Sequence, residues 1–176
     1  NADGNIEKET QNLILQSNNF GNGGYWNDVA VSVTSNQAGY DGTNDAFLIT
    51  KQSSSFARLQ QNLSLSGVVT MSAYLKAGTE SLSTFRLGIS DYSVQFRLDT
   101  LVITDTGNIS AIDTGIEDVG SGWYRCHATW NVASTSVVQY YVGWNASDSN
   151  TLYIQDAQVE QGLVARDYIE TTTAAV

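Results

Sequence analysis

The fold class follows most directly from residues 123–130, which read WYRCHATW. Every second residue from Tyr124 to Trp130 is apolar or aromatic, whereas Arg125 and His127 stand between them. This period of two is typical of a β-strand, because successive side chains of a strand point to opposite faces. Similar alternation occurs at residues 29–34, 70–76, 84–90, 93–99, 137–145 and 152–159.

Turn-forming residues separate these runs, as at 41–42, 77–78, 106–108, 120–122 and 147–150. One strand follows another with no helical pattern between them, so we expect antiparallel sheets. This many short strands indicates a sandwich or barrel. The sequence therefore predicts an all-β, antiparallel domain.

The predicted domain spans residues 11–170. Residues 1–10 are interpreted as an N-terminal arm or linker, and residues 171–176 as a C-terminal tail that leads to a neighbouring domain. With 176 residues, of which 41% are hydrophobic, the chain suits a single domain with one core. The polar, acidic start carries no signal-peptide pattern, so the chain resembles a mature protein or an excised module.

Composition narrows the classes of partner. The net charge is -10, with eight Lys and Arg against eighteen Asp and Glu, which argues against a nucleic-acid partner. No run approaches the roughly 20 apolar residues of a membrane-spanning helix, so no membrane partner is expected. One Cys and one His exclude the common zinc sites built from these residues.

The polar faces of the alternating runs share a basic and aromatic character. Four of the eight basic residues fall on them. If these strands form one sheet, one solvent-facing surface carries half of the cations of an acidic protein. The predicted ligand-binding residues on it are Tyr74, Lys76, Arg86, Arg97, Arg125, His127, Gln139, Tyr141 and Asn145.

Arginine binds carboxylates through its two-pronged guanidinium group, and aromatic rings with planar amides suit sugars. The surface is therefore predicted to bind a glycan, and an acidic one. The alternative is that these faces are ordinary solvated strand faces. Trp26 follows the Gly-rich residues 21–24 and is a further candidate for stacking on a sugar, whereas Trp123 and Trp144 are interpreted as core residues.

Several segments, in order, resemble β-sandwich modules found in phage tail proteins and secreted polysaccharide-active enzymes. The segments that carry the resemblance are NLILQSNNF (12–20) followed by Tyr25-Trp26, YDGTNDA (40–46), SAYLKAG (72–78), GWYRC (122–126) and LYIQDAQVEQG (152–162) followed by 167–169 and 171–172.

The resemblance implies a jelly-roll sandwich similar to carbohydrate-binding modules. It also implies a monomeric, non-catalytic accessory module of a carbohydrate-active enzyme or of a virion protein, attached to other domains. Such a module would be secreted or carried on a virion, and its partner would be a polysaccharide or a cell-surface glycan.

Modules of this kind often carry a structural calcium ion, which takes oxygen ligands from carboxylates and amides. The positions that match are Asn19, Asn44, Asp45 and Asp156. The acidic residue usually found beside the opening Phe is replaced by Gly21. In the alternative interpretation, the acidic side chains of the 40–46 segment only cap a turn.

Two further functions stay open at this point. A polysaccharide lyase could use His127 and Tyr141 for proton transfer and Arg125 to neutralise a uronate. Alternatively, the chain could be a structural or receptor-binding segment of a phage tail fibre or adhesin. A glycosidase is disfavoured because no pair of carboxylates stands out in the alternating runs.

Overall fold

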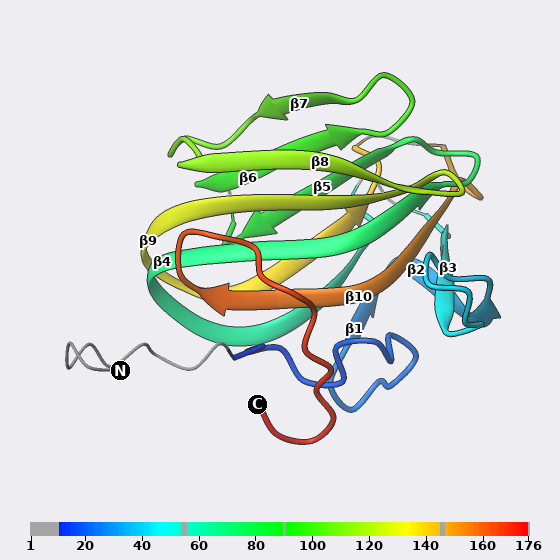
Figure 1. Ribbon diagram of the computed structural model, residues 1–176, viewed down its shortest axis with the longest axis horizontal. Coiled ribbons are helices and arrows are strands. Elements are labelled where there is room, and N and C mark those ends of the chain that lie inside the picture. The colour runs from blue at the N-terminus through cyan, green and yellow to red at the C-terminus, as the bar shows by residue number, and fades with distance from the viewer. Residues whose placement is uncertain (1–10, 54–55, 90, 145–146, 176) are drawn as a thin grey trace.

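The computed structural model describes residues 11–175 apart from 54–55, 90 and 145–146. This part of the chain contains no helix, and ten strands make up its regular structure (Figure 1). The strands are β1 (Asn27–Val29), β2 (Val31–Gln37), β3 (Ala46–Lys51), β4 (Arg58–Ala77), β5 (Leu82–Leu87), β6 (Tyr92–Arg97), β7 (Val102–Asp105), β8 (Asp113–Gly120), β9 (Trp123–Val142) and β10 (Thr151–Gln161).

Hydrogen bonds join the strands into one antiparallel sheet in the order β2-β3-β10-β4-β9-β5-β6-β7, with β1 beside β4 and β8 beside β9. The two 20-residue strands, β4 and β9, pair along their whole lengths and bend. The start of β4 pairs with the end of β9, where Arg58 lies opposite Tyr141. The end of β4 pairs with the start of β9, where Lys76 lies opposite Trp123.

The bend folds the sheet into two layers. We call one the β5 layer: β1, the start of β4, the end of β9, β5, β6 and β7. The other is the β10 layer: β2, β3, β10, the end of β4, the start of β9 and β8. This arrangement confirms the predicted all-β, antiparallel sandwich of jelly-roll type.

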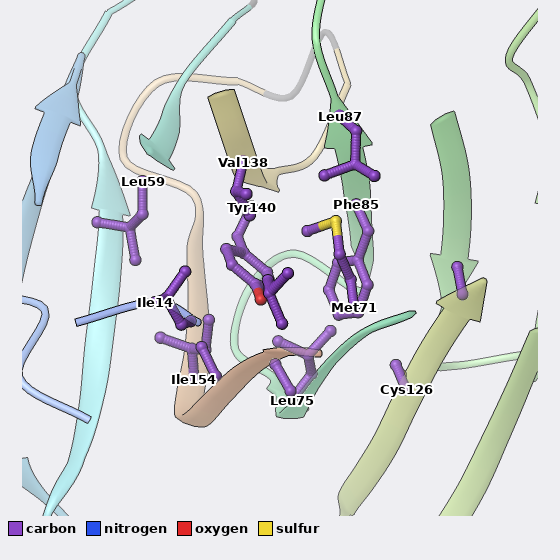
Figure 2. Close-up of a cluster of buried hydrophobic side chains, with 14 of the residues drawn as sticks. Ile14, Leu59, Met71, Leu75, Phe85, Leu87, Cys126, Val138, Tyr140 and Ile154 are labelled. Carbon is purple, nitrogen blue, oxygen red and sulfur yellow. The ribbon is translucent and has the colours of Figure 1, made fainter. Parts of the chain in front are cut away.

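The core lies between the layers and is built from the apolar sets that alternation assigns to the inner faces. Figure 2 shows Met71 and Leu75 of β4 packed with Phe85 of β5 and Tyr140 of β9. Burial of such apolar surface is the main favourable contribution to folding. Ile89 is an exception, because Gly88 adopts a left-handed backbone (φ 71) that ends the alternation, and Ile89 is 87% exposed.

Both ends of the described chain pack against the end of β10. The Asn12 side-chain amide donates to the carbonyls of Ala157 (3.1 Å) and Ile169 (2.9 Å). Thr171 is buried, and its amide donates to Ser17 Oγ at 2.9 Å, so packing extends through Thr171. The predicted N-terminal arm, residues 1–10, lies outside the described residues. No helix that could cross a membrane occurs in the described chain.

Candidate functional site

The predicted ligand-binding residues lie on two opposite outer faces. Tyr74, Lys76, Arg125 and His127 lie on the β10 layer. The β5 layer carries Arg86, Arg97, Gln139 and Tyr141. The expectation of a single basic surface is therefore wrong, because β4 and β9 run through both layers and each contributes to both outer faces. Asn145 lies outside the described residues.

Trp26 belongs to the core and not to a surface. Its ring is 2% exposed and packs against Phe20 and Tyr140, with ring centres 5.0 and 6.2 Å apart. Its indole nitrogen donates to the Gln16 carbonyl at 2.8 Å. The sequence-based assignment of Trp26 to sugar stacking is thus corrected: the preceding glycine-rich loop turns the side chain inward.

The outer face of the β10 layer is covered in part by the chain itself. Residues 162–170 cross this face after β10 (Figure 1). The Arg125 guanidinium donates to the Arg166 carbonyl, and the Ile169 amide donates to Gln158 Oε1 at 2.8 Å. Glu160, which is 2% exposed, accepts from the Arg166 amide at 3.1 Å, and burial raises the pKa of its carboxyl.

Tyr74, Arg125 and His127 of the β10 layer also contact other side chains of the protein. The Tyr74 ring stacks on Tyr40 with centres 3.7 Å apart and planes 6° apart, and Arg125 lies 5.6 Å above Tyr74. His127 Nε2 lies 3.1 Å from Asp113 Oδ2. Tyr141 lies on the opposite face of the sandwich, so the three residues named for a lyase do not come together.

The outer face of the β5 layer carries an open groove instead. Two neighbouring hollows of about 350 and 470 Å³ share Arg86 as a lining residue. We call them the polar hollow and the apolar hollow, and together the β5-face groove. The polar hollow is lined by Arg86, Ser93, Gln95, Thr106, Asn108 and Trp144, and the apolar hollow by Phe56, Arg58, Arg86, Ile89, Gln139 and Tyr141.

Strand register explains why these side chains meet. Arg58 of β4 lies opposite Tyr141 of β9, and Gln139 of β9 lies opposite Arg86 of β5. Arg86 in turn lies opposite Ser93 of β6. Directly opposed residues of an antiparallel pair point to the same face, so this row faces solvent together.

Tyr141 supports the two arginines from below. The guanidinium carbons of Arg58 and Arg86 lie 5.6 and 6.0 Å from its ring centre, and Arg86 lies 5.5 Å from the Trp144 ring. Such contacts between a cation and an aromatic face hold the guanidinium groups in place. Tyr141 is only 3% exposed, so in the polar hollow the half-buried Trp144 is the ring that can stack on a ligand.

Arg86 retains donors that the protein does not use. Its Nη1 reaches Tyr141 Oη only at 3.4 Å, and its Nε is buried without a partner. Arg58 is more occupied, since its Nε donates to Gln60 Oε1 at 2.8 Å and its Nη1 to the Phe56 carbonyl at 2.9 Å. Among the described residues no Asp or Glu lines either hollow. The groove is therefore a basic site in an acidic protein.

Sequence reasoning missed part of this groove. Trp144 was assigned to the core with Val142, but Gly143 adopts a left-handed backbone (φ 64) after β9 and displaces the next side chain outward. Phe56 precedes β4 and Arg58 begins it, in a stretch that the sequence did not predict as a strand because the polar Gln61 interrupts the apolar period of two. Arg97 lies on the same face but does not line either hollow.

A second polar cluster surrounds Asp156, at a register shift in β10. Its carboxylate accepts from Tyr40 Oη at 2.9 Å, and its amide donates to Asn18 Oδ1 at 3.0 Å. Burial, with nearby Asp45, Asp41 and Glu170, raises the pKa of Asp156 to about 7.

The donor chemistry of this cluster suits calcium, because carboxylate and amide oxygens gather there. Asp45 accepts from the Gln155 amide at 2.7 Å, and Asn44 is exposed in the same turn. Asn19 instead donates to Gln16 Oε1 at 3.0 Å, and its neighbour Asn18 occupies the position beside Asp156. Within the described ranges, no three Asp, Glu, His or Cys side chains group closely enough to hold a metal.

No family model matches the chain, and no curated protein matches it. Among solved structures, the fold is similar to the CBM22-1 xylan-binding domain of Paenibacillus barcinonensis Xyn10C, at 14% identity and a TM-score of 0.51 over 90% of this chain and 100% of that one. It is also similar to the CBM22-1-GH10 modules of Clostridium thermocellum xylanase 10B complexed with xylohexaose, at 14% identity and a TM-score of 0.50. This match covers 87% of the chain but spans only 28% of the xylanase chain. At such identities the likeness shows the fold alone.

Proposed function

We propose that this chain is a non-catalytic carbohydrate-binding module that holds a polysaccharide or cell-surface glycan in the β5-face groove. The observation that carries the proposal is the grouping of Arg86 and Trp144 in an open hollow, where the Arg86 guanidinium and the Trp144 ring both contact the Tyr141 ring. Aromatic surface beside directed polar groups is the usual chemistry of a small-ligand site. The fold shared with a domain described as xylan-binding supports the same function.

The preferred ligand is an acidic polysaccharide rich in uronic acids, such as alginate or pectin. Two of the eight basic residues, Arg58 and Arg86, lie within the apolar hollow, and the chain as a whole carries a net charge of -10. A guanidinium group binds a carboxylate through two parallel hydrogen bonds, which adds both energy and orientation. The groove would thus select an anionic chain that the rest of the surface repels.

Binding without catalysis fits the chemistry of the groove. Hydrolysis of a glycosidic bond uses two carboxylates, and the described lining residues include none. His127 lies on the opposite outer face, so it is not available for proton transfer in this groove. As an accessory module, the chain would act outside the cell or on a virion, joined to other domains.

Affinity gel electrophoresis tests the proposal. We expect alginate or pectin in the gel to retard the protein and cellulose derivatives to retard it little. Arg86→Ala should lose most of the retardation. Arg125→Ala makes the same charge change on the opposite face and should keep it. Loss of binding in Arg125→Ala with full binding in Arg86→Ala would place the site on the β10 layer instead.

We further propose that calcium stabilises the fold at the Asp156 cluster, with Asp45 and Asp156 among its ligands and Asn19 and Asn44 as the other positions predicted from sequence. A hard cation would relieve the repulsion that Asp41, Asp45 and Glu170 exert on the buried carboxylate. A ligand that binds only the folded state raises the melting temperature. Chelation by EDTA should therefore lower it, and an unchanged melting curve would refute the calcium site.

A further inference from the structure

Two large apolar side chains stand exposed at the apolar hollow. Ile89 is 87% exposed and Phe56 is 48% exposed, and both line the same hollow as Arg58 and Arg86. Scattered exposed apolar residues are ordinary on a protein surface. Ile89 and Phe56 are not scattered singly, because they line one hollow together with two arginines. The hollow therefore combines apolar surface with groups that bind an anion.

The other half of the groove presents different side chains. Around Trp144, the polar hollow is lined by hydroxyl and amide side chains, namely Ser93, Gln95, Thr106 and Asn108. These groups hydrogen-bond sugar hydroxyls, and the Trp144 ring gives a sugar a surface to stack on, whereas exposed aliphatic side chains such as Ile89 line only the apolar hollow. The groove therefore has two chemically different halves that meet at Arg86.

We propose that the apolar hollow binds a uronic acid residue carrying an O-acetyl group, while the polar hollow binds the neighbouring sugar of the same chain. This inference rests on the proposed function and deepens it. The carboxylate would pair with Arg86, and the acetyl methyl would lie on Ile89 and Phe56. A methyl ester fits less well, because esterification of the carboxyl removes the charge that the arginines bind.

The test uses one alginate preparation before and after O-acetylation, so that chain length and uronate composition stay the same. We expect the acetylated polymer to bind about fourfold more tightly, the factor that corresponds to burial of one methyl-sized group. Ile89→Ser should abolish this preference, so that the variant binds the two polymers equally well. At 87% exposure, Ile89 contributes little to the core, so this variant should fold normally.

Ile112→Ser is the matched control, because Ile112 is 52% exposed and lines a separate hollow beside β7 and β8. It should keep the acetyl preference. Equal binding of both polymers by the wild type, with no effect of Ile89→Ser, would overturn this inference and leave the proposed function standing. Failure of both polymers to bind would overturn the proposed function itself.

Discussion

Arg86→Ala provides the sharpest test of the groove. In the folded protein this side chain makes one long hydrogen bond, of 3.4 Å to Tyr141 Oη, and two contacts above aromatic rings. Its terminal Nη donors are thus largely available to a ligand, whereas its Nε is buried. A hydrogen bond to a charged group contributes roughly 1.5–3 kcal/mol, so the variant should bind an acidic oligosaccharide about 10- to 150-fold more weakly.

The loss of stability should be smaller than the loss of binding. Each ring contact of an exposed cation contributes roughly 0.5–1 kcal/mol, so Arg86→Ala should lower the free energy of unfolding by about 1–2 kcal/mol. Isothermal titration calorimetry with uronate oligosaccharides measures the affinity, and urea unfolding measures the stability. Arg86→Lys keeps the charge but not the planar guanidinium fork, so its affinity for the ligand should lie between those of the wild type and Arg86→Ala.

Added salt should weaken the binding of an acidic ligand to this groove. An arginine–carboxylate contact at a solvated groove weakens as ionic strength rises, so wild-type affinity should fall with added NaCl and Arg86→Ala should respond less. If Arg86→Ala binds the ligand with an affinity within twofold of the wild type and responds to salt in the same way, Arg86 does not contact the ligand.

Three other predictions follow from the same structure. Trp144→Ala should reduce glycan affinity and also lose the ring contacts with Arg86, Tyr141 and Phe56. Trp26→Ala should instead mainly lose stability, by about 3–5 kcal/mol, because its ring is buried; calorimetry and urea unfolding separate the two effects. Burial raises the pKa of Glu160 above its ordinary value of 4.5, so the folded state holds this proton more tightly than the unfolded state, and stability should fall as the pH rises from about 4.5 through the raised pKa. Glu160→Gln should remove that part of the pH dependence, and an identical pH profile in wild type and variant would contradict the assignment. Asp156→Asn should abolish the effect of EDTA on the melting temperature, while the single substitution Asp113→Asn, remote in the β8–β9 pair, should leave it intact.

The alternation in the sequence predicted the inner faces well. Phe85 and Leu87 of β5 and Met71 of β4 are buried as their pattern indicates, because a period of two is enough to separate a core face from a solvent face. It failed where one residue took a left-handed backbone. After Gly88 and Gly143 the period breaks, and Ile89 and Trp144 move from their predicted core positions to the groove.

By itself, then, the sequence determined an all-β antiparallel sandwich, its inner faces and several of the groove residues, including Arg86, Gln139 and Tyr141. Local pattern suffices for these features, since the side chains of a strand alternate whatever its partners are. Only the tertiary structure decided which polar faces share a surface. Strands β4 and β9 bend from one layer into the other, so Arg125 and Arg86 look alike in sequence but lie on opposite outer faces. The course of residues 162–170 then decides which face is covered and which is open, because it depends on contacts between segments far apart in the chain.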